Sequence, residues 1–122
     1  MYARWMGLET ITPRALLELQ QREAVTVIDL NAPQAWRRAR VPGALNLDHE
    51  RYDRSALPSD PAAALVFYCS NVLCRKAPLA ARRAVRMGYE NVRVMSAGIR
   101  GWISAGLPTE AEGMDPPDLG AG

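Results

Sequence analysis

The fold is decided by residues 65–95, which read LVFYCSNVLCRKAPLAARRAVRMGYENVRVM. Residues 65–68 are apolar or aromatic without a break, which is typical of a strand covered on both faces. An Ala- and Arg-rich helix is predicted over residues 78–87, and Gly88 suits its left-handed end. Residues 92–95 predict another strand, so this spacing indicates an α/β domain with a mainly parallel sheet. The helix is expected to pack through Ala80, Ala81, Ala84 and Val85.

The flanking sequence continues the alternation of helices and strands. Thr12 and Pro13 supply a hydroxyl N-cap and a first-turn proline, and the apolar spacing that follows predicts a helix to about residue 22. Residues 25–30 are apolar or β-branched at nearly every position, which predicts a second buried strand. Shorter elements are expected at 33–39 (helix), 44–47 (strand) and 98–105 (helix).

Length and composition indicate one ordinary globular domain. The chain has 122 residues and a mass of 13.4 kDa, with 48% hydrophobic and 23% charged residues. These fractions exclude a disordered chain, a coiled coil and a collagen-like repeat. No apolar run approaches the roughly 18 residues that a membrane span needs. The N-terminus does not resemble a signal peptide, so we expect a cytoplasmic protein without a membrane partner.

The charges divide the chain into a basic body and an acidic tail. Residues 1–108 hold all 15 bases, fourteen of them Arg, against 9 acids, whereas residues 109–122 hold four acids and no base. We therefore predict a domain over 1–108 and a disordered, Pro- and Gly-containing tail over 109–122. A mildly basic body attracts small anions or an acidic partner protein. A plain solvated surface is the alternative, and nucleic acid is not an expected partner.

Two cysteines and one histidine limit the chemistry available to the chain. Two cysteines are too few for a disulfide framework, and Cys69 and Cys74, five residues apart, do not match the usual zinc spacings, so no metal or cofactor is expected. His49 lies in a polar stretch with Asp48 and Glu50, where a surface or capping role is favoured over catalysis.

Cys69 is the candidate nucleophile because it directly follows a buried strand, and ligands of open α/β sheets bind beyond the carboxyl ends of the strands. The next loop can offer backbone N–H groups to an anion, and the helix N-terminus adds partial positive charge. We expect these groups to lower the pKa of the thiol from about 8.5 by one unit or more. An inert cysteine packed at the strand end is the alternative. The predicted substrate-binding residues are Ser70, Asn71, Val72, Leu73, Cys74, Arg75 and Lys76.

Several segments, in this order, resemble a single-domain rhodanese over about residues 11–108. VTVIDLN at 25–31 and VPGALN at 41–46 resemble the family's first signature. FYC at 67–69 resembles the strand that ends in the catalytic cysteine, and AGIRGW at 97–102 resembles the closing signature. The resemblance implies a three-layer α/β fold, with a mainly parallel central sheet and helices on both faces.

The same resemblance implies a sulfurtransferase. The thiolate, here Cys69, would take sulfane sulfur from a donor such as thiosulfate and pass it from a persulfide to cyanide or a thiol. The backbone of residues 70–75 would hold the persulfide, while Arg75 and Lys76 attract the anionic donor. An acceptor protein is a further expected partner.

Departures from the family pattern keep other functions open. Asn31 stands where the family has Arg, and the Cys-x4-Cys-Arg-Lys loop lacks the common glycine and is longer than usual. A rhodanese-fold sulfur carrier or partner-binding module with little turnover is one alternative. Cys69 and Arg75 also satisfy the Cys-x5-Arg pattern of related phosphatases and arsenate reductases.

Cys74 lies in the same loop and has two candidate roles. As a resolving thiol it would attack a persulfide on Cys69 and form an internal disulfide. As a structural residue it would pack under the start of the helix. The sequence does not choose between these roles.

Overall fold

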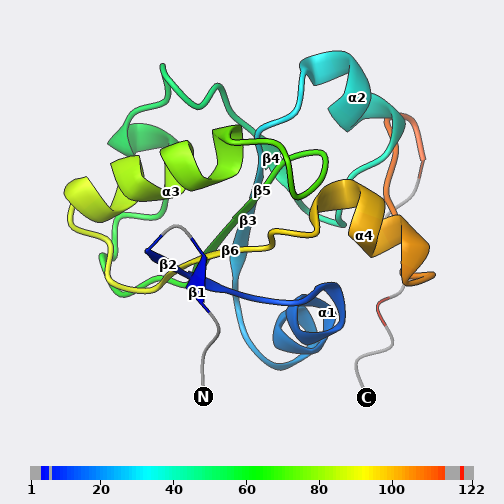
Figure 1. Ribbon diagram of the computed structural model, residues 1–122, viewed down its shortest axis with the longest axis horizontal. Coiled ribbons are helices and arrows are strands. Elements are labelled where there is room, and N and C mark those ends of the chain that lie inside the picture. The colour runs from blue at the N-terminus through cyan, green and yellow to red at the C-terminus, as the bar shows by residue number, and fades with distance from the viewer. Residues whose placement is uncertain (1–3, 6, 115–118, 120–122) are drawn as a thin grey trace.

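The computed structural model describes residues 4–5, 7–114 and 119, which form a single sheet flanked by helices. The strands are β1 (Arg4–Trp5), β2 (Leu8–Thr10), β3 (Thr26–Asp29), β4 (Leu45–Asn46), β5 (Leu65–Tyr68) and β6 (Val92–Val94). Their order across the sheet is β1-β2-β6-β5-β3-β4 (Figure 1). β1 pairs antiparallel with β2, and every other neighbouring pair is parallel, which confirms the predicted mainly parallel sheet.

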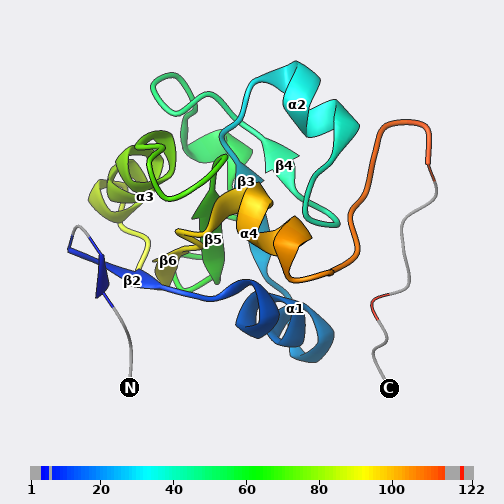
Figure 2. The same ribbon diagram turned by 45° about the vertical axis from the view of Figure 1, so that its right-hand side comes forward.

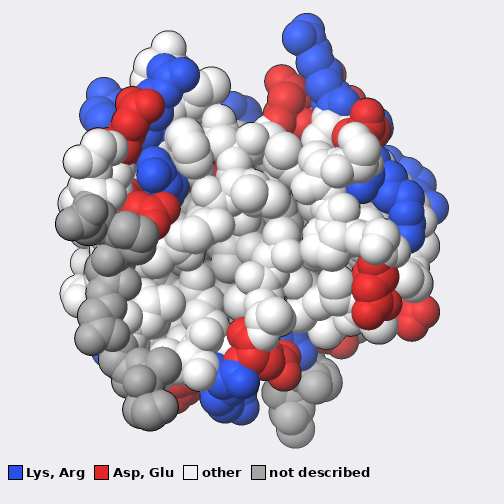
Figure 3. Space-filling model, turned by 180° about the vertical axis from the view of Figure 1, so that it is seen from behind, with Lys and Arg blue, Asp and Glu red and all other residues white. Residues whose placement is uncertain are grey.

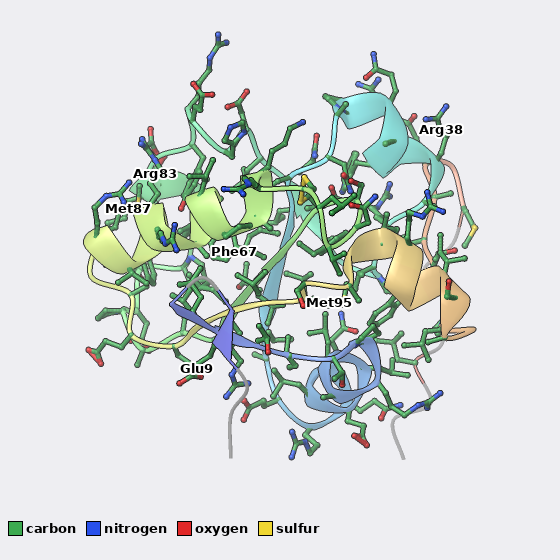
Figure 4. All side chains as sticks on the ribbon, viewed as in Figure 1. Glu9, Arg38, Phe67, Arg83, Met87 and Met95 are labelled. Atoms are coloured by element: carbon green, nitrogen blue, oxygen red, sulfur yellow. A yellow bond between two sulfur atoms is a disulfide. The ribbon has the colours of Figure 1, made fainter. Side chains whose placement is uncertain are left out.

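Helices cover both faces of this sheet. α3 (Lys76–Arg86) covers one face, while α1 (Pro13–Arg22) and α4 (Gly98–Ser104) cover the other (Figure 2). Phe67 lies under α3, and Met95 lies on the side of α1 and α4 (Figure 4). The predicted three-layer α/β fold is therefore confirmed. Two short elements, α2 (Pro33–Arg38) and the 3-10 helix η1 (Arg54–Ala56), lie in the connections before and after β4.

α3 packs closely because its inner face is made of alanines. Ala80, Ala81 and Ala84 are fully buried against the sheet. The helix begins two residues earlier than predicted, since Pro78 in its first turn needs no amide partner there. Val85 is 49% exposed, so its predicted place on the packing face is wrong. It lies one residue beyond Ala84, which turns it about 100° around the helix.

The N-terminal hairpin of β1 and β2 is not predicted from the sequence. Arg4 pairs with Glu9 and Trp5 with Leu8, around a turn in which Gly7 has a φ of 78°. These strands are too short and too polar to show an alternating pattern. Parallel pairing of β2 with β6 supplies the support that the local sequence lacks.

The start of the acidic tail is tied to the domain, so the predicted disorder does not begin at residue 109. Arg40 and Glu110 exchange two backbone hydrogen bonds of 3.0 and 2.9 Å, and Arg40 Nε donates to Glu110 Oε1 at 2.8 Å. The Glu112 amide also donates to the Arg37 carbonyl at 2.8 Å. The rest of the predicted tail, residues 115–118 and 120–122, lies outside the described residues.

A buried carboxyl–phenol pair joins β3 to β5 behind the candidate nucleophile. Asp29 is fully buried. Its Oδ2 accepts a hydrogen bond from the Tyr68 hydroxyl at 2.6 Å, and its Oδ1 accepts one from the Asn31 backbone amide at 2.7 Å. The Tyr68 oxygen in turn accepts the Val41 amide at 3.0 Å. Burial raises the pKa of Asp29 above its ordinary 3.8, although these hydrogen bonds act in the opposite direction.

Asp29 is expected to make the free energy of unfolding fall as the pH rises above about 4. Its pKa in the folded protein lies above the ordinary 3.8, so the folded state binds more protons in that window than the unfolded state. The linked stability is present at low pH and is lost as the pH rises through the folded pKa. Denaturant titrations at several pH values should show wild type losing stability relative to Asp29→Asn as the pH rises. A constant difference, or one that shifts toward wild type, would contradict the raised pKa.

Candidate active site

Cys69 directly follows β5, the strand between β6 and β3, and is 3% exposed. Two backbone amides near the N-terminus of α4 donate hydrogen bonds to the carbonyls of Cys69 and Ser70. The Ile99 amide donates to the Cys69 carbonyl at 2.9 Å, and the Arg100 amide donates to the Ser70 carbonyl at 3.1 Å. Two separate elements therefore position this cysteine at the carboxyl edge of the sheet.

Gly98 allows α4 to approach the loop this closely. Its φ is 66°, and a Cβ atom at this position would lie 2.5 Å from the Ser70 carbonyl carbon and oxygen. The same Cβ would lie 2.7 Å from the Asn71 nitrogen. Because both the dihedral angle and the space exclude a side chain, only glycine fits here without movement of the loop.

Cys69 and Cys74 form a disulfide across the loop (Figure 4). Their Cα atoms are 6.3 Å apart, within the range that disulfides span. Cys74 is half-buried and packs against the apolar cluster that contains Cys69. The two sulfur atoms can therefore meet without unfolding of the loop, and reduction must precede any attack by Cys69 on an external molecule.

The loop uses two of its own amides internally. The Leu73 amide donates to Asn71 Oδ1 at 2.9 Å, and the Cys74 amide donates to the Asn71 carbonyl at 3.1 Å. The amides left to bind an anion lie at the two ends of the loop, where α3 begins without a side-chain cap. Within the described residues, no acceptor meets the amides of Ser70, Asn71, Val72, Arg75 and Lys76.

Four side chains of the loop and of the start of α3 are exposed to solvent. Val72 is 57% and Leu73 is 84% exposed, and Arg75 and Lys76 are also exposed. A molecule that approaches the loop therefore meets two cations and two apolar side chains.

On the face seen from behind, charged side chains of both signs lie along the rim around a largely uncharged centre, so the excess positive charge is not gathered there (Figure 3).

Two asparagines, Asn31 after β3 and Asn46 in β4, organise the carboxyl end of β3. The Asn46 side-chain amide donates to the Asn31 carbonyl at 2.9 Å and to the Asp29 carbonyl at 3.0 Å. Because Asp29 pairs with Tyr68 across the strands, these bonds also steady the edge from which Cys69 projects.

A pocket of about 320 Å³, with both apolar and polar walls, lies beside the loop, and the sequence does not predict it. Its walls come from the segments after β3 and β4 and from the start of α3, and they include His49 and Lys76. These two residues are far apart in the chain, so no local motif signals that they share a cavity. A larger cavity of about 620 Å³ lies between β2 and the far half of α3, away from Cys69.

Two kinds of feature are absent from the part of the chain that the structure describes. No group of three or more His, Cys, Asp or Glu side chains is arranged there to hold a metal ion. No helix of this part is long and apolar enough to cross a bilayer.

Comparison with known proteins finds the same type of domain. A family model described as a rhodanese-like domain matches residues 12–105. The uncharacterised protein slr1261 of Synechocystis is 29% identical over 100 residues, 82% of this chain and 55% of that protein, so the chain spans about half its length. Thiosulfate sulfurtransferase GlpE of Actinobacillus succinogenes is 29% identical over 112 residues, 91% of this chain and 99% of that protein. The BH2092 protein of Bacillus halodurans superposes with a TM-score of 0.75 at 18% identity, over 90% of this chain and 82% of that chain.

Proposed function

Because this chain belongs to the rhodanese-like family, we propose that it is a sulfurtransferase that carries sulfane sulfur on Cys69. The observation that carries the proposal is the position of Cys69, which follows the buried strand β5 and is held by the amides at the start of α4. The similarity to thiosulfate sulfurtransferase GlpE, which extends over nearly the whole of both chains, supports this reaction class.

The first half-reaction loads sulfur onto Cys69. A dithiol, or two thiols, first reduces the disulfide with Cys74. The Cys69 thiolate then attacks the outer sulfur of thiosulfate, the S–S bond of the donor breaks, and sulfite leaves with the bonding electron pair. Arg75 and Lys76, both exposed on the loop, attract this dianion.

The second half-reaction unloads the sulfur. Cyanide or a thiolate attacks the outer sulfur of the persulfide, the S–S bond of the persulfide breaks, and Cys69 leaves as a thiolate. The amides at the two ends of the loop are available to stabilise the anionic persulfide, because neighbouring residues do not use them. We place the reaction in a reducing compartment such as the cytoplasm, which keeps both cysteines as thiols.

Production of thiocyanate and sulfite from thiosulfate and cyanide tests the proposed function. We expect turnover by the reduced protein, and neither hydrolysis of an aryl phosphate nor reduction of arsenate. Hydrolysis of the aryl phosphate or reduction of arsenate, without production of thiocyanate, would show that the protein is an oxyanion enzyme of the Cys-x5-Arg type and not a sulfurtransferase. A persulfide that forms but is not passed on would indicate a sulfur carrier.

Cys74 is proposed to limit the lifetime of the persulfide. Its sulfur reaches the Cys69 sulfur in the folded loop. The Cys74 thiolate attacks the inner sulfur of the persulfide, the S–S bond breaks, hydrosulfide leaves, and the Cys69–Cys74 disulfide closes. A dithiol then returns both residues to thiols.

Cys74→Ser is expected to lengthen the lifetime of the persulfide by about 10-fold or more, since an intramolecular thiol reacts at high effective concentration. The measurement is hydrosulfide release from loaded protein without an acceptor. In wild type, intact mass should show disulfide closure at the same rate as hydrosulfide release. Equal lifetimes in wild type and Cys74→Ser would leave Cys74 with a packing role only.

A further inference from the structure

The apolar wall of the pocket beside the loop belongs to the same apolar cluster as the reactive cysteine. Leu30 and Leu47 line the pocket, and both pack in the cluster that holds Cys69 and Cys74. The Leu30 amide also donates to the Tyr68 carbonyl at 2.9 Å, so Leu30 lies alongside the end of β5. Cys69 does not itself line the pocket, but Leu30 lies between the pocket and the end of the strand that Cys69 follows, so a molecule in this pocket is near the reactive cysteine.

Opposite charges line this pocket from two different elements. Lys76 comes from the start of α3, and Asp48 comes from the segment after β4. Neither forms an ion pair with another described residue. A hydrogen bond from the Glu50 amide is the main cause that lowers the pKa of Asp48, which keeps this side chain a carboxylate.

The size of the pocket limits what it can hold. Its volume of about 320 Å³ is at the lower end of the range for small-molecule sites. A purely anionic ligand would be repelled by Asp48, and a purely cationic ligand by Lys76. A small zwitterion pairs with both charges, with its carboxylate toward Lys76 and its ammonium toward Asp48.

We propose that the pocket lined by Lys76 and Asp48 binds a small amino-acid thiol as the acceptor of the Cys69 sulfur, which deepens the proposed function and rests on it. The bound thiol loses its proton to solvent, and its thiolate attacks the outer sulfur of the persulfide. The S–S bond of the persulfide breaks, its electron pair returns to Cys69, and the acceptor leaves as an amino-acid persulfide. The amide side chains of Asn31 and Asn46 and the imidazole of His49 complete the polar part of the wall.

The test follows single-turnover discharge of a preloaded Cys69 persulfide by three small thiols. L-cysteine carries both charges, cysteamine lacks the carboxylate, and 3-mercaptopropionate lacks the ammonium. Preloading removes the donor step, and each variant is compared with wild type for the same thiol, so intrinsic thiol reactivity cancels. Lys76→Gln should slow discharge by L-cysteine and 3-mercaptopropionate about 10-fold and leave cysteamine unchanged. Asp48→Asn should slow L-cysteine and cysteamine by a similar factor and leave 3-mercaptopropionate unchanged.

Arg86→Gln, at the far end of the same helix, is the matched control and should change none of the three rates. Equal effects of a pocket variant on all three thiols would overturn the inference, as would discharge by cyanide but by no thiol, and the proposed function would stand in both cases. Failure of any persulfide to form on Cys69 would overturn the proposed function itself, and this inference with it.

Discussion

Cys69→Ser is expected to lower sulfur transfer from thiosulfate to cyanide by about 1000-fold or more. A serine hydroxyl is not ionised near neutral pH and is a poor nucleophile toward sulfur, so the first half-reaction cannot start. The loop should keep its shape, because its contacts with α4 are made by the carbonyls of Cys69 and Ser70 rather than by the thiol. Thiocyanate production under steady-state conditions measures the effect.

Cys74→Ser is the matched control for that substitution. It also removes one thiol and prevents the disulfide, but it leaves Cys69 able to attack thiosulfate. We expect it to retain thiocyanate production, and we expect both variants to unfold at similar denaturant concentrations under reducing conditions. Loss of activity in Cys74→Ser with retention in Cys69→Ser would mean that the other thiol is the nucleophile.

Gly98→Ala is expected to lower sulfur transfer by about 100-fold, since displacement of a reactive group by about 1 Å can have an effect of that size. The new Cβ atom would lie 2.5 Å from the backbone carbonyl of Ser70, which a flexible side chain cannot relieve. Either α4 or the residue next to Cys69 must therefore move. The readouts are thiocyanate production and the rate of persulfide formation.

Gly106→Ala is the control that distinguishes the effect of this steric contact from the effect of backbone strain. Gly106 also has a positive φ, 75°, but a Cβ atom there would meet nothing within 4 Å. Both variants should lose about 1–2 kcal/mol of stability to the left-handed dihedral angle. Only Gly98→Ala should lose activity per folded molecule. Equal activity in the two variants would show that the contact between α4 and the loop does not position Cys69.

The elements with strong local patterns are predicted well. β5 is an unbroken apolar run, and all four of its residues are buried. α1 begins at Pro13, and its N-cap Thr12 accepts the Ala15 amide at 3.1 Å, as a hydroxyl before a proline predicts. In both elements the signal is contained within a few neighbouring residues, so no knowledge of the tertiary structure is needed.

The features that the sequence does not predict depend on pairing between distant segments. The β1–β2 hairpin has no alternating pattern and is held by β6. The tail contact needs Arg40 and Glu110 to meet across most of the chain. Spacing places both cysteines in one loop, but the disulfide and the internal hydrogen bonds of Asn71 depend on how that loop folds back. The pocket with Lys76 and Asp48 likewise arises only when β4 pairs beside β3.

The most direct test of the central claim is the intact mass of the reduced protein after incubation with thiosulfate. We predict a lasting gain of one sulfur atom in Cys74→Ser, a transient gain followed by closure of the Cys69–Cys74 disulfide in wild type, and no gain in Cys69→Ser. Addition of cyanide should return loaded Cys74→Ser to its starting mass. An unchanged mass of Cys74→Ser, or a gain of sulfur that persists in Cys69→Ser, would contradict a persulfide on Cys69.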